Sequence, residues 1–165
     1  MKRTILPLIV CFLLLATLSA CGGDGKAKAA ERYRLSMRTW ATEMMGSAMQ
    51  VSGMFSDEQT ASALLGGDAA KERKLNANLR KLSSCSKGVK ALGTAPSEYR
   101  RARAKALRAC THFETGADLI KLGLTAAQGG LGVDLLEGAA SDLQDGIIAV
   151  PVGDLKLQQD VDQHS

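Results

Sequence analysis

The chain has 165 residues, of which 21 are Lys or Arg and 17 are Asp or Glu, and its formal net charge is +4. This length suits one folded domain rather than two, and an aromatic content of only 4% leaves few side chains to stack on nucleic-acid bases. We therefore expect one domain that binds no nucleic acid, and the scarcity of aromatic and β-branched residues favours helices throughout.

Residues 1–20 have the three-part layout of a secretory signal peptide. The parts are a basic start at Lys2 and Arg3, an apolar run from Ile5 to Leu15, and small residues from Ala16 to Ala20. The apolar run is short for a membrane span, so we expect this segment to be cleaved off. A lone transmembrane anchor, or an ordinary signal peptide that merely contains a cysteine, is the alternative interpretation.

The end of this segment, Leu18-Ser19-Ala20-Cys21, resembles the lipobox of bacterial lipoproteins. The resemblance implies that a diacylglyceryl group is joined to the Cys21 sulfur and that a peptidase cuts between Ala20 and Cys21. It further implies a lipoprotein held on the extracytoplasmic side of a bacterial membrane, in the cell envelope. In two-membrane bacteria an aspartate after the acylated cysteine favours the inner membrane, so Gly22 permits an outer-membrane destination.

Residues 21–30 are predicted to be a flexible tether, because their glycines and charged residues cannot build a core. The mature chain from Cys21 is close to neutral. Loss of Lys2 and Arg3 lowers the basic count from 21 to 19, against 17 acidic residues.

Apolar residues at helical spacing predict four main helices in the domain, which we place at residues 31–150. They run over residues 31–55, 70–92, 97–127 and 133–149, with a short turn or extension at residues 57–65. Short connections between amphipathic helices favour an all-α, up-and-down four-helix bundle.

The segment that follows, residues 151–165, is polar and begins with Pro151, which stops the last helix. We expect this tail to be disordered or to form a loose strap.

Two cysteines remain once the signal peptide and the lipid are accounted for. Cys11 leaves with the signal and Cys21 carries the lipid, so Cys85 and Cys110 are free to pair. In an oxidising compartment such a pair usually forms a disulfide. We therefore predict a bond between the second and third helices, which stabilises the fold by about 3 kcal/mol on the chain-entropy model.

Charge is strongly segregated along the chain. Residues 71–108 contain twelve Lys and Arg against Glu72 and Glu98, whereas residues 114–165 contain nine acids against two lysines. One face of the third helix is predicted to contact an anionic partner, either an envelope protein or an anionic polymer or headgroup, through Arg101, Lys105 and Arg108. The alternative is a solvated face, partly neutralised by acids of the fourth helix at Asp134, Glu137, Asp142 and Asp145.

No motif of the mature chain predicts catalysis or a cofactor. The di-iron signature Glu-x-x-His, the Gly-x-Ser-x-Gly elbow and the His-Glu-x-x-His zinc motif are all absent. Cys110 and His112 are two residues apart on a helix, so their side chains point away from each other. Met45 and Met49 are four apart, and thioethers suit Cu(I), so a copper site is an alternative to their lying at the flank of a core that Met37 and Met44 fill.

These patterns together favour a non-enzymatic, lipid-anchored binding or interaction module of the cell envelope. A copper-handling lipoprotein that uses Met45 and Met49 is the second hypothesis. An unrecognised enzyme is the third, and it would need polar groups clustered in a pocket of the folded domain.

Overall fold

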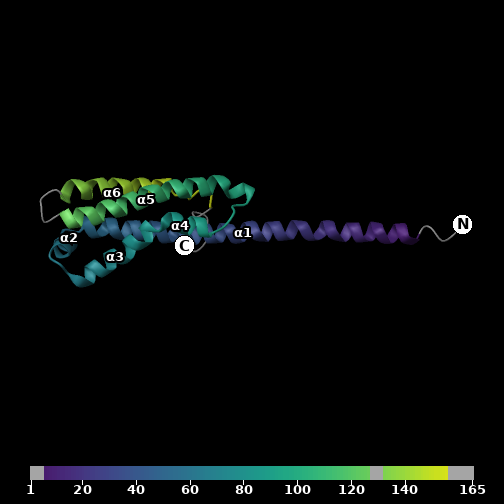
Figure 1. The fold of residues 1–165 in the computed structure, drawn as a ribbon, viewed down its shortest axis with the longest axis horizontal. Coiled ribbons are helices and arrows are strands. Elements are labelled where there is room, and N and C mark those ends of the chain that lie inside the picture. Colours follow the sequence, from purple (N-terminus) through teal and green to yellow (C-terminus); the bar gives the residue numbers. More distant parts are fainter. Residues whose placement is uncertain (1–5, 127–131, 156–165) are drawn as a thin grey trace, which may run out of the picture.

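The computed structural model describes the backbone of residues 6–126 and 132–155, and the side chains of residues 25–126 and 135–155. The described chain contains six α-helices and one short 3-10 helix, and it contains no strand (Figure 1). The predicted all-α class is therefore confirmed. The helices are α1 (Leu6–Ser56), α2 (Glu58–Leu65), α3 (Ala69–Ser83), α4 (Cys85–Ala91), η1 (Ser97–Tyr99), α5 (Arg100–Ala126) and α6 (Gly132–Ala149).

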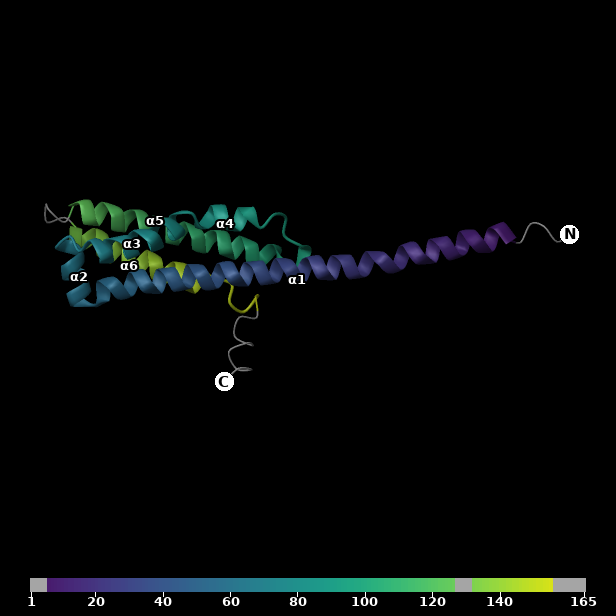
Figure 2. The same cartoon turned by 90° about the horizontal axis from the view of Figure 1, so that it is seen from below.

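Helix α1 begins at Leu6, well before the predicted start at residue 31. Figures 1 and 2 show its first half projecting beyond the other helices. Residues 25–29 are exposed, and Tyr33 is the first buried residue from position 25 onward. Alanines at positions 27, 29 and 30 explain why the helix continues here without tertiary contacts, because alanine has the highest helix propensity. The side chain of Cys21 lies outside the described residues.

The apolar stripe that predicted the first helix is the side of α1 that packs against the domain. Every member from Tyr33 to Val51 is buried, at Tyr33, Met37, Trp40, Met44, Ala48 and Val51. Phe55, the last residue of the stripe, is partly buried against the same core. Burial of one continuous stripe explains why α1 runs straight past the other helices.

The described chain has six helices, where four main helices and a short turn or extension were predicted. The predicted helix at 70–92 is divided at Ser84 into α3 and α4, where the Ser84 hydroxyl donates to the Lys81 carbonyl oxygen, 3.1 Å away. The predicted turn at 57–65 is the separate helix α2. Side chains at the N-caps begin α2 and α3, since Asp57 accepts a hydrogen bond from the Thr60 amide and Asp68 from the Ala70 amide.

Helices α3 and α4 together run antiparallel to α1. Asn78 Nδ2 in α3 donates to Gln50 Oε1 in α1 at 3.2 Å, while further along the chain Gly88 in α4 lies beside Trp40. The contacts therefore move toward the N-terminus of α1 as the chain advances through α3 and α4, which is the pattern of antiparallel helices. The break at Ser84 interrupts the hydrogen-bonded helix but keeps its direction.

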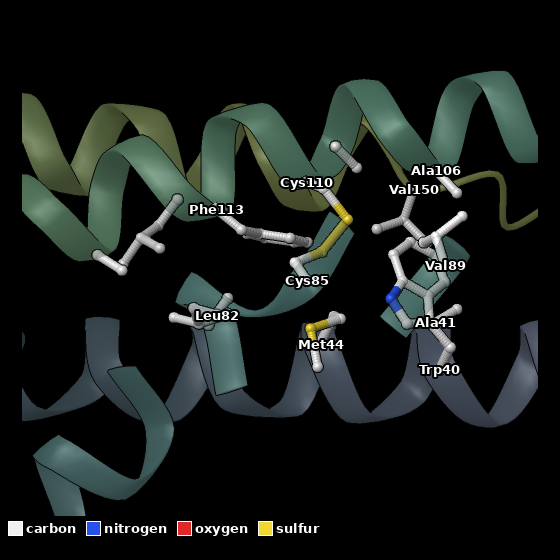
Figure 3. Packing of buried hydrophobic residues seen from close by; sticks show 14 of the residues in the cluster. Trp40, Ala41, Met44, Leu82, Cys85, Val89, Ala106, Cys110, Phe113 and Val150 are labelled. Carbon is white, nitrogen blue, oxygen red and sulfur yellow. A yellow bond between two sulfur atoms is a disulfide. The ribbon is translucent and has the colours of Figure 1, made fainter. Parts of the chain in front are cut away.

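The predicted disulfide is confirmed. Cys85 at the start of α4 and Cys110 in α5 are bonded, with Cα atoms 5.2 Å apart. Both residues are fully buried, and Figure 3 shows the bond among core side chains that include Met44 and Phe113. The bond therefore joins α4 to α5 inside the hydrophobic core.

Helices α5 and α6 are antiparallel and close. Gly116 lies against Leu143, and Gly146 lies against the ring of Phe113. After α6 the chain forms a turn over residues 152–155, and Leu155 is fully buried. Residues 151–155 are thus a packed strap, which corrects the expected loose or disordered tail over those five residues, and the apolar Leu155 side chain provides the reason. Residues 156–165 lie outside the described part of the chain.

Candidate functional site

The three basic residues singled out on the third predicted helix all lie on α5, but they are not equivalent. Arg101 and Arg108 are exposed, and neither forms an ion pair with a described acidic residue. Lys105 is different, because its Nζ lies 2.7 Å from Asp154 Oδ2 of the strap. The lysine charge is therefore already neutralised, and two of the three predicted contact residues keep an available charge.

Among the described acids of α6, none forms an ion pair with Arg101, Lys105 or Arg108. Asp142 lies 3.4 Å from His112 Nδ1, and both Glu137 and Asp145 are exposed without an ion pair to the described basic residues. The side chain of Asp134 lies outside the described residues. The strap, which sequence patterns did not predict to be ordered, supplies the acid instead.

The other basic residues of the segregated segment are mostly exposed on α3 and α4. Lys81 lies 3.2 Å from Glu43 of α1, with both side chains about half exposed at 49%. Surface pairs of this kind contribute little to stability. A broad positive surface therefore runs over α3, α4 and the first half of α5, with exposed side chains at Arg73, Lys74, Arg80, Lys87, Lys90, Arg100, Arg101 and Arg108.

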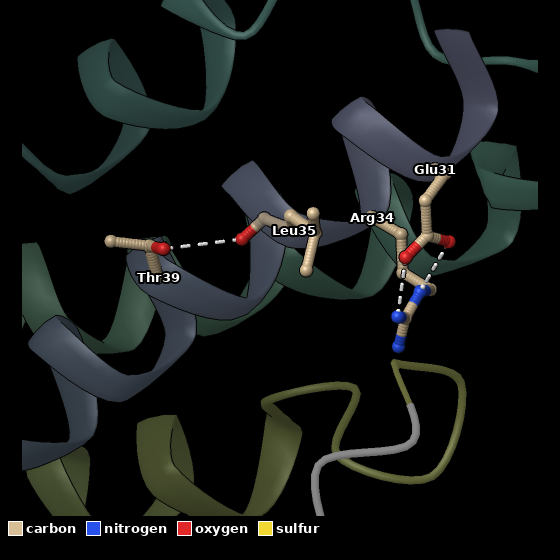
Figure 4. Close-up of polar contacts among 4 residues, drawn as sticks. All are labelled: Glu31, Arg34, Leu35 and Thr39. Atoms are coloured by element: carbon tan, nitrogen blue, oxygen red, sulfur yellow. Dashed lines mark hydrogen bonds and ion pairs between the residues drawn. The ribbon is translucent and has the colours of Figure 1, made fainter. Parts of the chain in front are cut away.

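An ion pair lies on α1 where the helix enters the packed domain (Figure 4). Arg34 holds Glu31 through two contacts, at 2.6 Å from Nη2 to Oε1 and 2.9 Å from Nε to Oε2. One turn further on, the Thr39 hydroxyl donates to the Leu35 carbonyl oxygen at 3.2 Å. The Glu31 carboxylate is thus occupied by its neighbour on the same helix.

Two buried donors, on Tyr33 and Arg103, lie where α1 meets α5, and a third, on Trp40, lies beside Gly88 of α4. Tyr33 Oη, Trp40 Nε1 and Arg103 Nε are inaccessible and have no hydrogen-bond partner among the described residues. Burial raises the pKa of the Tyr33 phenol, and the nearby Arg103 charge opposes that rise. The rings of Tyr33 and Tyr99 also lie 6.0 Å apart, centre to centre. The contacts of Tyr33 with Tyr99 and Arg103 therefore bring the start of α5 beside the start of the packed part of α1.

A pocket of about 300 Å³ lies between the end of α1, α2 and the facing sides of α5 and α6. Its walls are mainly apolar, and polar groups come from Ser52, Ser56 and Glu137. No histidine or cysteine lines it, so it lacks a pair of nucleophile and base. The sequence did not predict this pocket, because its lining residues come from four separate helices.

The cysteine and histidine considered for catalysis are not brought together. Cys110 is consumed by the disulfide, and His112 faces Asp142 rather than a thiol. Met45 is partly buried against the core, whereas Met49 is 61% exposed. No group of three or more His, Cys, Asp or Glu residues that could hold a metal occurs in the described ranges. The copper hypothesis stays an untested prediction.

Among the helices of the described residues, none has an apolar stretch long enough to cross a lipid bilayer. Comparisons of the chain with protein-family models, with curated proteins and with solved structures found no match.

Proposed function

We propose that the protein is a lipid-anchored, non-enzymatic interaction module on the extracytoplasmic side of a bacterial membrane. The observation that carries this proposal is the sequence Leu18-Ser19-Ala20-Cys21 at the end of a signal-like segment. Acylation of Cys21 with two chains would supply stable anchoring, since one chain binds a membrane only weakly.

The buried disulfide supports export. Disulfides persist in oxidising compartments and are rare in the cytosol, where thiols are kept reduced. Cys85 and Cys110 form such a bond inside the core, and neither is accessible for metal binding or catalysis. An exported protein is the simplest setting for a structural disulfide in a domain of this size.

The exposed start of α1 supports a tethered domain. Tyr33, the first buried residue among the described side chains, lies twelve positions after Cys21, which corresponds to about 18 Å of helix. Within that segment residues 25–29 are exposed. A lipid at Cys21 would therefore leave the packed domain accessible to partners.

Binding rather than catalysis is favoured by the sites that the fold builds. The pocket has no nucleophile beside a base, while Arg101 and Arg108 present unneutralised charge on a broad positive surface. We propose that the α5 part of this surface, at Arg101 and Arg108, contacts an anionic partner in the cell envelope. We also propose that the six helices act as an up-and-down bundle of four columns, in which α3 and α4 together form one column.

Metabolic labelling with an alkyne analogue of palmitate tests the anchor. We expect label on the wild-type chain and on Cys85→Ser, the matched cysteine control, and none on Cys21→Ser. We also expect Cys21→Ser to leave the membrane fraction. Equal labelling of all three chains, or none on the wild type, contradicts the proposal.

Crosslinking in cells, followed by mass spectrometry, tests the partner surface. The double variant Arg101→Glu/Arg108→Glu should lose capture of anionic partners, whereas Arg73→Glu/Arg80→Glu on α3 provides a matched reversal elsewhere. If both doubles and the wild type capture the same set, the first half of α5 is not the contact surface.

A further inference from the structure

Exposed basic residues follow one another along α1 just after the position of the proposed anchor. Lys26, Lys28 and Arg32 are all exposed, and none forms an ion pair with a described acid. Arg32 Nε reaches the Lys28 carbonyl oxygen at 3.4 Å, which leaves the guanidinium charge uncompensated. The neighbouring Glu31 carboxylate is held by Arg34 at 2.6 Å.

The tertiary fold adds two more basic residues to this end of the domain. The contact of the Tyr33 and Tyr99 rings, with centroids 6.0 Å apart, brings the first residues of α5 beside α1. In both Figures 1 and 2 the start of α5 lies at the end of the domain from which α1 projects. Arg100 and Arg101 are exposed there. These two arginines, with Lys26, Lys28 and Arg32, form what we call the basic collar.

Acids at this end are fewer than the basic residues of the collar. Glu98 is exposed, Asp154 is already held by Lys105 at 2.7 Å, and the side chain of Asp24 lies outside the described residues. The far end of the domain, around α2 and the start of α3, carries a mixture instead. Its acids are Asp57, Glu58, Asp68 and Glu72, and its basic residues are Lys71, Arg73 and Lys74. The excess of positive charge therefore lies on the side of the proposed lipid.

We infer that the basic collar docks on the surface of an anionic lipid bilayer, the same bilayer that holds the acyl chains of Cys21. The inference rests on the proposed lipid anchor and names the partner for one end of the positive surface. A basic segment beside a lipid anchor is the pairing of signals that gives stable and oriented membrane binding. Docking directs the far end of the domain, with its apolar pocket, away from the bilayer.

The distance of the collar residues from Cys21 determines whether they can reach the lipid headgroups. Along a straight helix, Lys26 lies about 8 Å from Cys21 and Arg32 about 17 Å from it. Charges are screened over about 8 Å at physiological ionic strength, so an upright helix would hold Arg32 out of range. Gly22, Gly23 and Gly25 are poor helix formers at the base of this segment, so it can bend and bring the collar down.

The single tryptophan of the chain, Trp40, provides the measurement. Energy transfer from Trp40 to a dansyl-labelled lipid headgroup reports how close the domain lies to the bilayer. The acylated protein is reconstituted in vesicles of phosphatidylcholine alone, or of phosphatidylcholine with phosphatidylglycerol. We expect stronger transfer on the anionic vesicles. Raising salt from about 0.1 M to about 1 M, which shortens the screening length from about 10 Å to about 3 Å, should remove the difference.

Charge reversal locates the contact. Each of Arg32→Glu, Arg100→Glu and Arg101→Glu should lower the ratio of docked to undocked domain about fivefold or more on anionic vesicles. The triple variant should behave as on neutral vesicles. A control triple on α3, Arg73→Glu/Lys74→Glu/Arg80→Glu, makes the same charge change away from the collar and should keep most of the transfer.

The outcomes separate this inference from the proposed function. Protein that floats with neutral vesicles, yet shows the same transfer on both lipid compositions, is anchored but not docked, and overturns the inference alone. Protein that fails to float with neutral vesicles carries no anchor and overturns both. Equal loss in the collar and control triples would show a general charge effect and would also overturn the collar assignment.

Discussion

Helix α6 has two neighbours, and it meets them in different ways. Against α5 the packing is close, because glycines remove side chains from the interface. A Cβ at Gly146 would lie 2.5 Å from the Phe113 ring, and one at Gly116 would lie 3.1 Å from Leu143. Against α1 the same helix leaves a pocket of about 300 Å³ beside Phe55, Leu136 and Ala140.

The difference shows how one amphipathic helix can serve both a rigid and a spacious interface. Leu143 lies at both, since it contacts Gly116 of α5 and also lines the pocket. Interfaces packed to interior density do not tolerate added volume, whereas a pocket can accept it. Substitutions that add volume to α6 should therefore lower the free energy of unfolding on the side that faces α5 and raise it on the side that faces the pocket.

The largest effect is expected for Leu143→Ala, which removes a fully buried side chain from both interfaces at once. Loss of buried apolar atoms together with the enlarged cavity should lower the free energy of unfolding by about 3 kcal/mol. Chemical denaturation monitored by far-UV circular dichroism measures this change in the free energy of unfolding. The control is Ile148→Ala on the same helix, where the side chain is 72% exposed, and its change should stay within about 0.5 kcal/mol. Equal effects at the two positions would contradict the burial argument.

Gly146→Ala should be the next most damaging change. The new methyl group would meet the ring of Phe113 at 2.5 and 2.6 Å, and that ring is fully buried and cannot move aside. We expect a net loss of about 2 kcal/mol despite the better helix propensity of alanine. Combining it with Phe113→Leu, which makes room for the methyl group, should recover part of the loss. An additive double variant would show that the two residues do not clash.

Filling the pocket should raise the free energy of unfolding rather than lower it. Ala140→Leu extends an apolar side chain toward Phe55 and Leu136, which also line the pocket, and should raise the free energy of unfolding by about 1 kcal/mol. Thermal denaturation provides the measurement. A fall in the melting temperature would mean that the space between α1 and α6 is already filled in solution.

Gly138→Ala should have the smallest effect and is the matched control for Gly146. At this position of the same helix a Cβ would meet only Leu119, at an ordinary contact distance of 3.7 Å. The gain in helix propensity should therefore dominate and stabilise the fold by about 0.5 kcal/mol. If both glycine variants destabilise equally, close packing against Phe113 is not the cause.

Much of the helical content could be predicted from local patterns. Buried residues of α1 from Tyr33 to Val51 repeat at helical spacing, and the pairing of Cys85 with Cys110 followed from the cysteine count. The predicted last helix, residues 133–149, agrees with α6 to within one residue at its start. Local patterns did not predict the break at Ser84, since the segment around it, from Leu82 to Ser86, contains no proline or glycine that would end a helix.

The candidate site could be predicted only in part. Arg101 and Arg108 were found from their charge and helical position, and both are exposed. The neutralisation of Lys105 by Asp154 depends on a strap that returns to α5, and the pairing spans 49 residues of sequence. No local pattern reports a contact across that separation.

Three features could be predicted from the sequence alone, because each depends on composition or on short spacing. They are the signal-like segment that ends at Cys21, the all-helical class and the identity of the two bonded cysteines. Only the tertiary structure decided that α5 starts beside α1, that Leu155 is buried under the end of the domain, and that α6 packs closely on one side and loosely on the other. These features depend on which helix faces meet and how closely they pack. The closeness of packing is set by the combined volumes of side chains that lie far apart in the sequence.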